Sequence, residues 1–431
     1  MRHPRPLTRP LRLLFAAGIV LGAAGCQFRS RNPPMTSASE AKFPLTGLVD
    51  LAYEQGQGGG PVRLFMIHGI HSHPVGWAES GYLDYFVADP KAKEHGWTVS
   101  ICTPAQPVRW MEPAATTSNP NPPNQAEYPA ADFCGKLQVY RIVDGSGKTC
   151  VVAYELTWSL LTDPFKAWRF RNGNNSGFND EEQYRPVVNQ VIRDTLDENL
   201  SDAVLYARGF DGNIIGKTAS HALELFYTGE LDPDQGDAAG TKRHSAPTVF
   251  LTESLGSIIL AEAMTAHVRD LAPGHRRSGM RDVLRNLRTV YMMANQIALL
   301  DMPVPDPKGN VIPSLQADEA AMNSGSAEKH GVFRSFIDSR KSLVAGTDEA
   351  GAVAARPRAA PLLVAAFSDL YDDLSYRVST DSLPESDAKV DNFYPRNSAN
   401  VLGIFENPDT AHTGYGANPD VVRVVMEGYS P

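Results

Sequence analysis

The fold is decided by the stretch T-V-F-L-T-E-S-L-G-S-I-I-L, which runs from Thr248 to Leu260. Its first four residues predict a short buried strand, and the pattern from Ser257 onward predicts a helix. Ser254 lies between them, at the apex of a tight turn. Such a turn lifts the serine hydroxyl out of the sheet, and the N–H of Leu255 points into the same space, where it can stabilise an oxyanion. Alternatively, Ser254 only caps the helix, which is common for serine.

Outward from this stretch, short β-rich apolar runs alternate with helical patterns. This alternation is typical of an α/β protein with a mostly parallel sheet that helices cover on both faces. The predicted strands are Val62 to Ile67, Thr98 to Cys102, Cys150 to Leu156, Thr248 to Leu251, Thr289 to Ala294, Leu362 to Phe367 and Asn400 to Phe405. The predicted helices are Tyr184 to Leu200, Ser257 to Leu271, Val332 to Val344 and Asp420 to Gly428.

Three segments interrupt the alternation. Residues 103–133 are rich in Pro, Asn and Ala and predict an irregular surface excursion. Residues 158–246 carry helical patterns and polar loops between two strands, and residues 302–360 contain a single helical pattern. Long insertions are either surface decoration or functional lids. We expect decoration unless an active site lies beneath them.

Three further polar motifs each follow a predicted strand. They are I-H-G-I at 67–70, F-S-D-L-Y-D-D-L-S-Y at 367–376 and A-H-T-G-Y at 411–415. Together with T-E-S-L-G-S at 252–257, and in this order, the motifs resemble the α/β-hydrolase superfamily of esterases and lipases. The resemblance covers most of residues 62–428 in architecture. It implies a doubly wound, mostly parallel eight-stranded sheet in one domain from residue 44 to residue 431, with the insertions named above.

The resemblance also implies a catalytic triad in the chain order serine, acid, histidine. Four histidines follow Ser254. His267 and His275 lie in or just after the helix that leaves the turn, and His330 lies inside a polar insertion. His412 lies in a loop between the final predicted strand and the C-terminal helix, so it is the expected base. The alternative is an exposed loop histidine without a role.

Three aspartates compete for the role of the triad acid, which orients the imidazole and favours the imidazolium. Asp372 is the expected acid, because this stretch resembles acid loops of bacterial lipase-like hydrolases in which an Asp three residues before a Ser-Tyr pair takes the role. Asp369 is the second choice and Asp373 the third. Asp301, after the preceding strand, is a further candidate. Any of these carboxylates can instead be a solvated surface group.

The resemblance assigns the oxyanion hole to the N–H groups of Leu255 and Ile70. A strand that ends in His68-Gly69 is the usual form of the first oxyanion loop in this fold, because the glycine lets the backbone turn toward the substrate carbonyl. His68 is then structural and braces the loop. The implied mechanism requires no cofactor and no metal.

The expected function is therefore that of a serine esterase acting on small-molecule or lipid esters. A non-catalytic binding scaffold is a second hypothesis, because Thr252 replaces the first glycine of G-x-S-x-G and the insertions are long. A nitrogen of His412 within hydrogen-bond reach of the Ser254 hydroxyl would favour the enzyme.

A metal-dependent hydrolase is a third hypothesis. His68, His71 and His73 lie within six residues and could supply imidazole ligands to zinc. No spaced partner such as an H-E-x-x-H helix accompanies them, which weakens this interpretation.

The N-terminal residues predict a targeting signal. Residues 1–25 contain four arginines and then an apolar run that is too short to span a bilayer comfortably. The run ends in Ala-Ala-Gly-Cys26, which resembles a bacterial lipobox, although Leu21 lies five rather than three residues before the cysteine. Cys26 would then carry a lipid, and Gln27 favours the outer membrane by resemblance to the sorting pattern. An ordinary secretory signal is the alternative.

Residues 26–43 predict a lipidated end and a flexible tether. The formal net charge of −9 becomes −13 when residues 1–25 are removed, because that segment holds four arginines and no acid. This strongly negative charge, together with the lack of a Lys/Arg cluster, argues against nucleic-acid binding and against adsorption to anionic lipid. We expect membrane contact through the lipid anchor alone, at the outer membrane and facing the periplasm.

Three cysteines follow the lipobox: Cys102, Cys134 and Cys150. An export signal permits a disulfide. Cys134 and Cys150 bracket an apparent hairpin around the turn at 144–147, so they are the favoured pair. Three cysteines leave one over, and the sequence leaves their connectivity open.

Overall fold

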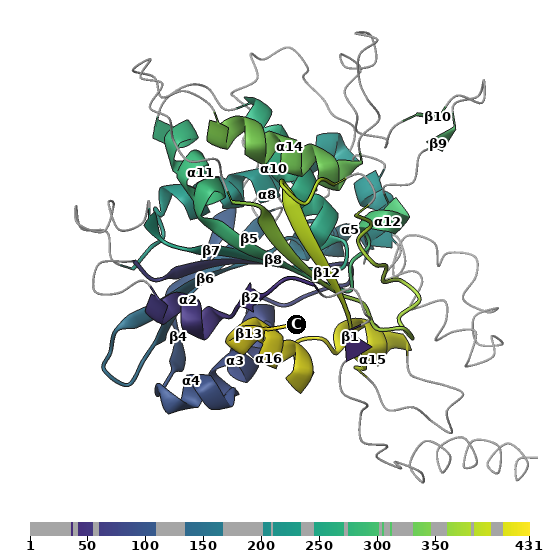
Figure 1. Ribbon diagram of the computed structural model, residues 1–431. Helices are drawn as coiled ribbons and strands as arrows, with labels where there is room; N and C mark the ends of the chain where they lie inside the picture. Colours follow the sequence, from purple (N-terminus) through teal and green to yellow (C-terminus); the bar gives the residue numbers. More distant parts are fainter. Residues whose placement is uncertain are drawn as a thin grey trace, which may run out of the picture.

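The architecture was analysed in a computed structural model (Figure 1). The structure describes residues 36–37, 42–54, 60–108, 134–166, 201–207, 210–233, 245–270, 275–300, 304–305, 311–312, 331–345, 360–380, 383–397 and 408–431. Among them, no helix has the length and apolar character needed to cross a membrane.

One mixed sheet forms the centre of the molecule, with the strand order β1-β12-β11-β8-β7-β3-β6-β5-β4. Six neighbouring strands run parallel: β12 (Ala388–Tyr394), β11 (Leu362–Phe367), β8 (Leu287–Met293), β7 (Thr248–Glu253), β3 (Val62–Ile67) and β6 (Thr149–Thr157). Antiparallel strands complete both edges: β5 (Gly135–Val143), β4 (Thr98–Val108) and the two-residue β1 (Thr36–Ser37). The prediction of an α/β fold with a mostly parallel sheet is confirmed.

Helices cover both faces of this sheet (Figure 1). One face carries α8 (Phe210–Thr228), α10 (Gly256–Asp270), α11 (His275–Asn286) and α14 (Val332–Ala345). The other face carries α2 (Leu48–Glu54), η2 (Glu79–Leu83), α3 (Asp84–Ala88), α4 (Pro90–Glu94) and α16 (Pro419–Glu427). The remaining short elements are β2 (Leu45–Thr46), η3 (Ser159–Leu161), α5 (Asp163–Lys166), α12 (Ile297–Leu300), β9 (Val304–Pro305), β10 (Val311–Ile312), α15 (Pro408–Thr413) and β13 (Gly428–Tyr429).

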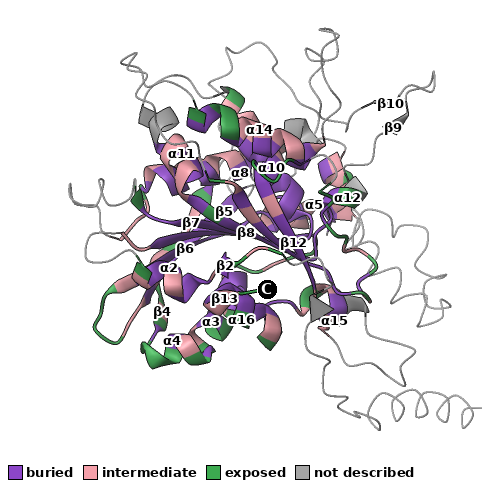
Figure 2. Cartoon of the chain, in the orientation of Figure 1, coloured by how far each residue is buried: buried purple, intermediate pink, exposed green. Residues whose placement is uncertain are grey.

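The core divides into two apolar clusters, one on each face of the sheet. In β3, Phe65 and Ile67 pack into the cluster beneath α10, whereas Leu64 and Met66 pack into the cluster beneath α16. All six residues of β3 and of β7 are buried, as expected for central parallel strands that are covered on both sides (Figure 2). These two rigid strands hold the sequence motifs that follow them.

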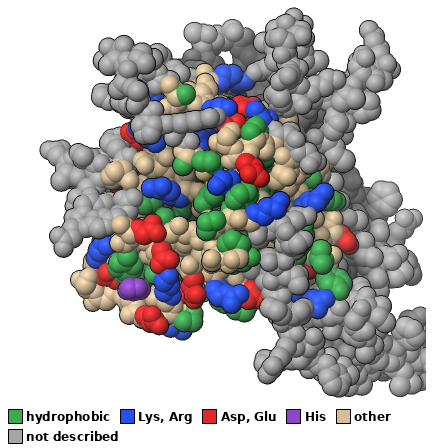
Figure 3. Space-filling model, in the orientation of Figure 1, with side chains coloured by type: hydrophobic (Ala, Val, Ile, Leu, Met, Phe, Trp, Pro, Cys, Tyr) green, Lys and Arg blue, Asp and Glu red, His purple; other side chains and the backbone are tan. Residues whose placement is uncertain are grey.

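The surface carries charges of both signs. On the face shown in Figure 3, lysine and arginine side chains alternate with aspartate and glutamate side chains over the described part of the chain. The view shows no broad field of a single sign among those residues.

One predicted strand boundary was wrong, and one strand was not predicted. Residues 103–108, expected within an irregular excursion, continue β4 and pair with β5 through two register shifts. The strand that follows β11 is β12 at Ala388–Tyr394. The predicted strand at Asn400 to Phe405 and the predicted helix at Tyr184 to Leu200 lie outside the described residues.

The favoured disulfide between Cys134 and Cys150 is also wrong, because Cys102, Cys134 and Cys150 are all free thiols. The predicted hairpin exists, but its antiparallel pairing sets Lys136 opposite Thr157 and Val143 opposite Thr149. Cys134 and Cys150 therefore lie at opposite ends of the hairpin, roughly 20 Å or more apart at about 3.3 Å per strand residue. A disulfide needs its two Cα atoms within about 7 Å.

The N-terminal segment joins the sheet at the outer edge of β12. Thr36 pairs with Tyr394 and Ser37 with Phe393, in antiparallel orientation. The buried Asp391 of β12 then accepts the backbone N–H groups of Lys42 and Phe43, at 2.7 and 3.2 Å. The chain thus enters the sheet beside β12, next to the carboxyl end of that strand.

Candidate active site

Ser254 lies on the turn between β7 and α10, as the sequence predicted. Its φ angle is +51°, a left-handed conformation that side-chain-bearing residues adopt only when the surroundings enforce it. The Ser254 N–H donates to the carbonyl of Met293 at the end of β8, at 2.8 Å. The turn is therefore fixed by the neighbouring strand, and α10 begins two residues later.

Two glycines allow the turn to pack directly against the end of β3. A Cβ atom on Gly256 would lie 2.7 Å from the carbonyl oxygen of His68 and 2.8 Å from that of Ile67. A Cβ atom on Gly69 would lie 2.3 Å from the Cβ atom of Ser254. All three distances are shorter than real Cβ contacts, so only glycine fits either position without a backbone shift.

Thr252 replaces the first glycine of the usual pattern, and the structure shows how its hydroxyl is accommodated. Thr252 is fully buried, and its Oγ1 lies 2.8 Å from the Oγ of Ser257 on the first turn of α10. Thr252 Oγ1 also donates to the carbonyl of Tyr291, at 3.4 Å. The departure from G-x-S-x-G is thus compensated by hydrogen bonds that join β7, β8 and α10.

The Thr252 and Ser257 hydroxyls should be energetically coupled, so that removing both costs less stability than the sum of removing each. Thr252→Val or Ser257→Ala alone leaves a buried hydroxyl without that partner, and we expect each to lower the free energy of unfolding by about 1–3 kcal/mol. The double variant should lose less than the sum of the two, because no hydroxyl is left without its partner. Urea titration of the four proteins measures the coupling, and strict additivity would contradict it.

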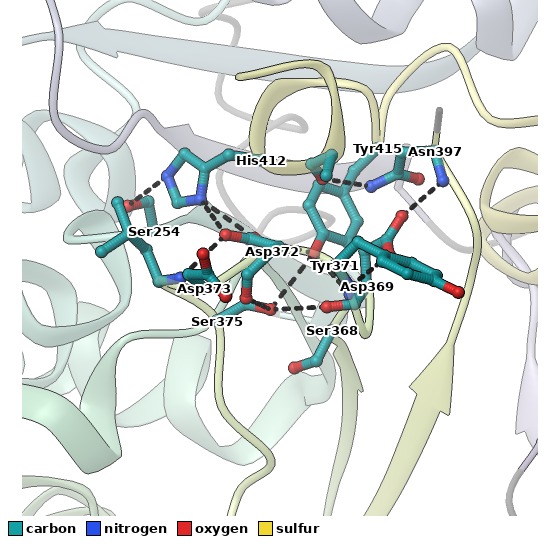
Figure 4. Close-up of polar contacts among 12 residues, drawn as sticks. Ser254, Ser368, Asp369, Tyr371, Asp372, Asp373, Ser375, Asn397, His412 and Tyr415 are labelled. Carbon is teal, nitrogen blue, oxygen red and sulfur yellow. Dashed lines mark hydrogen bonds and ion pairs between the residues drawn. The ribbon is translucent and has the colours of Figure 1, made fainter. Parts of the chain in front are cut away.

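The side chains of Ser254, His412 and Asp372 form one hydrogen-bonded chain (Figure 4). The Nε2 atom of His412 lies 3.1 Å from the Oγ of Ser254. The Nδ1 atom of His412 lies 2.9 Å from each carboxylate oxygen of Asp372. An ionised carboxylate can only accept, so the proton of the neutral imidazole lies on Nδ1 and leaves Nε2 to accept the serine hydroxyl.

His412 belongs to the short helix α15, not to the loop that the sequence predicted. His412 still lies between the last strand of the central sheet and the C-terminal helix α16, as predicted, because α15 follows β12 and precedes α16. The imidazole is mostly buried, with 13% of its side chain exposed, while the Asp372 side chain is 1% exposed.

The carboxylate of Asp372 is held from two further directions. The N–H of Leu374 donates to Oδ1 at 3.0 Å, and the hydroxyl of Tyr415 donates to Oδ2 at 3.1 Å. The Tyr415 oxygen in turn accepts the N–H of Asp369 at 2.7 Å. The sequence indicated no role for Tyr415, although it belongs to the A-H-T-G-Y motif. Its position three residues after His412 was the feature that could have indicated one.

The competing aspartates occupy other environments. Asp369 accepts the N–H groups of Tyr371 and Asn397, at 2.9 and 2.6 Å, so it ties two segments of backbone together (Figure 4). Asp373 is exposed. Asp301 lies outside the described residues. Among the described residues, Asp372 is thus the carboxylate that contacts His412.

His68 is fully buried at the end of β3 and is hydrogen bonded at both ring nitrogens. Its Nδ1 lies 2.8 Å from the carbonyl of Gly69, and its Nε2 accepts the N–H groups of Trp158 and Ser159, at 3.1 and 3.4 Å. The Nδ1 atom therefore carries the proton. Burial holds the pKa of His68 well below its ordinary value, so the ring is neutral and braces the loop after β3.

These bonds leave His68 without a ring nitrogen for a metal. Within the parts of the chain that the structure describes, no group of three potential ligand side chains is arranged to hold a metal ion. The rings of His68 and His73 lie 4.3 Å apart in tilted contact, alongside Trp77. The rings of His68 and His73 therefore pack the loop that follows β3.

The predicted oxyanion donors lie on either side of the serine. Leu255 follows Ser254 at the start of α10, and Ile70 follows Gly69, which packs against Ser254. Both residues are buried, and within the described residues neither backbone N–H has a hydrogen-bond acceptor. Two N–H groups without an acceptor in the described part of the chain therefore belong to residues beside Ser254, as an oxyanion hole would require.

Glu253 is a second buried carboxyl beside the serine that the sequence analysis missed. It accepts the hydroxyl of Tyr82 at 3.2 Å. Burial raises the pKa of Glu253, and the nearby His412 opposes that shift. The signal was present in the sequence, since an acidic residue at the end of a buried apolar strand is unusual.

The histidine cluster should make the protein less stable in acid. Burial lowers the pKa of His73 from 6.5 to about 4. Unfolding therefore takes up a proton between these values, and the free energy of unfolding falls as the pH drops from 6.5 to 4. Relative to His73→Phe, the wild type should lose about 2–3 kcal/mol over this window. Denaturant titrations at pH 7, 5.5 and 4 measure the difference, and parallel curves would contradict it.

Comparisons with protein families, with curated proteins and with solved structures find no match for this chain.

Proposed function

We propose that this protein is a serine hydrolase of the α/β-hydrolase type that cleaves carboxylic esters through an acyl-enzyme on Ser254. The observation that carries the proposal is the chain from Ser254 Oγ through His412 Nε2 and Nδ1 to Asp372, at 3.1 and 2.9 Å. The left-handed turn at Ser254 supports the same chemistry, as do the N–H groups of Leu255 and Ile70, which have no acceptor among the described residues.

In the proposed reaction, Ser254 Oγ attacks the ester carbonyl while His412 Nε2 takes up its proton. Asp372 stabilises the imidazolium that forms and keeps the ring oriented. The N–H groups of Leu255 and Ile70 stabilise the negative charge on the carbonyl oxygen. The alcohol leaves with the proton from His412, and a water molecule, deprotonated by His412, then hydrolyses the acyl-enzyme.

The two other hypotheses receive less support. A binding scaffold would not need His412 Nε2 at 3.1 Å from the Ser254 hydroxyl, with Asp372 on the opposite nitrogen. A zinc enzyme built on His68, His71 and His73 would need a free nitrogen on His68, and both of its nitrogens pair with backbone groups.

We further propose that the protein is a lipoprotein of the cell envelope, lipidated on Cys26 and facing the periplasm from the outer membrane. The small residues before Cys26 and the glutamine after it support this location. The substrates would then be small-molecule or lipid esters at that membrane. Metabolic labelling with a palmitate analogue, compared between the full chain and Cys26→Ala, tests the lipidation.

A fluorophosphonate probe tests the catalytic proposal directly, because it reacts with an activated serine. Folded wild-type protein should be labelled on the peptide that contains Ser254, as located by mass spectrometry, and Ser254→Ala should not be labelled. Ser80→Ala provides the control, since Ser80 is exposed and its hydroxyl donates to the carbonyl of Gly76. Equal labelling of wild type and Ser254→Ala, or none in either, would overturn the proposal.

A further inference from the structure

The oxyanion loop at residues 70–73 is held by side chains from the insertion that follows β6. The N–H of His71 donates to Asp202 Oδ2 at 3.0 Å, and the N–H of His73 donates to Ser159 Oγ at 3.0 Å. The hydroxyl of Ser72 donates to Asp163 at 2.6 Å. Each residue of the loop after Ile70 therefore has a partner in the insertion.

Of the two carboxylates among these partners, Asp202 is more deeply buried than Asp163. Its side chain is fully buried and forms an ion pair with Lys166, at 2.9 Å, whose own side chain is 7% exposed. Burial raises the pKa of Asp202, and the charge of Lys166 opposes that shift. A buried ion pair of this kind contributes little to stability compared with apolar residues of similar size, so stability alone does not account for it.

The backbone of His71 needs such a partner. Its φ angle is +89°, in the left-handed region that non-glycine residues avoid. The N–H that Asp202 accepts belongs to the peptide group that joins Ile70 to His71. Holding this peptide group also restricts the backbone orientation of Ile70. The N–H of Ile70, in the preceding peptide group, is the proposed oxyanion donor. Without the acceptor, we expect His71 to relax toward negative φ and to rotate that donor away from Ser254.

We propose that Asp202 is a positioning residue for the oxyanion hole, which acts through the His71 N–H and is kept in place by Lys166. This inference rests on the proposed function and deepens it. Lys166 ends α5, and Asp202 lies in the helical stretch 201–207, so the two come from separate parts of the insertion. The insertion expected to be decoration thus completes the catalytic site, and the active geometry exists only while the segment 201–207 is docked on the loop.

A matched pair of double variants tests the role of the acceptor. Asp202→Asn with Lys166→Met removes both charges but keeps an oxygen for the His71 N–H. Asp202→Leu with Lys166→Met has nearly the same shape and no acceptor. We expect the Asn/Met protein to keep kcat within about fivefold of wild type and the Leu/Met protein to lose about 100-fold, with KM nearly unchanged in both, since one oxyanion donor contributes about 10²–10³-fold to kcat.

Affinity for an alkyl trifluoromethyl ketone gives a second measure, because its adduct with Ser254 places an oxyanion in the hole. Of the two double variants, only the Leu/Met protein should bind this ketone about 100-fold more weakly than wild type does. We expect the two double variants to have similar thermal stability. Equal kcat and equal ketone affinity in the two double variants would overturn the inference. Wild-type protein that neither hydrolyses esters nor reacts with the fluorophosphonate would instead overturn the proposed function.

Discussion

Replacing Ser254 or His412 by alanine should lower kcat for ester hydrolysis by about 10⁵–10⁶-fold, and replacing both should lower it no further. Ser254 Oγ would form the acyl bond, and His412 Nε2, 3.1 Å away, would accept its proton. Neither group accelerates the reaction without the other, so the two losses should not add. The rate of p-nitrophenyl butyrate hydrolysis at pH 8 measures all three variants against wild type.

Their folding should be unaffected, which separates a catalytic loss from a structural one. The side chains of Ser254 and His412 hydrogen bond to each other, and His412 also bonds to Asp372, so we expect unchanged far-UV circular dichroism and a small shift in Tm. Ser80→Ala should hydrolyse the ester at the wild-type rate. A double variant that is slower than both single variants by a further large factor would contradict the triad.

Asp372→Asn should lower kcat by about 10⁴-fold while the protein remains folded. The asparagine amide can present an N–H to His412 Nδ1, and that arrangement favours the ring tautomer with the proton on Nε2. Nε2 could then no longer accept the proton of Ser254. The amide also cannot stabilise the imidazolium as a carboxylate does. Hydrolysis rates measured from pH 6 to 9 report both effects.

The neighbouring aspartates supply matched controls for this assignment. Asp373→Asn should leave kcat unchanged, because Asp373 is exposed. Asp369→Asn should lower the free energy of unfolding, because Asp369 accepts two backbone N–H groups, but should change kcat by less than about tenfold. A loss near 10⁴-fold in either control, with Asp372→Asn fully active, would assign the acid elsewhere.

The sequence predicted the elements whose side chains are uniformly apolar. β3 and β11 contain at most one polar residue each, and their boundaries follow from composition alone. β7 begins at the predicted Thr248 but continues two residues beyond the predicted end, to Glu253. The position of His412 followed from chain order rather than from its own neighbours. The helix α15 that carries it was missed, because six residues beginning with a proline give no helical periodicity.

β12 was missed because its polar residues are buried for specific reasons. Asp391 accepts backbone N–H groups from residues 42 and 43, and Asn392 bonds to both backbone groups of Val378. In the sequence these two residues suggest an exposed loop. Their partners are more than ten residues away, so no local pattern could reveal that the polar groups are satisfied inside the sheet.

The far end of β4 was missed for a different reason. Pro104 and Pro107 argue against a strand in a sheet interior, yet β4 lies at the sheet edge and bulges where it meets β5. An edge strand tolerates proline, because one row of its N–H groups has no partner strand. Edge position is a property of the whole topology and could not be inferred from the segment itself.

If Cys26 carries a lipid as proposed, the pairing of β1 with β12 limits the distance between the membrane and the end of the sheet that bears Ser254. Thr36 pairs with Tyr394, at the end of the sheet where the strands leading to Ser254 and Asp372 also finish. Thr36 is ten positions after Cys26, so the two Cα atoms can be at most ~35 Å apart when the chain between them is fully extended. A lipid on Cys26 would therefore hold the carboxyl ends of the parallel strands close to the bilayer. The amino ends of these strands would face away from it.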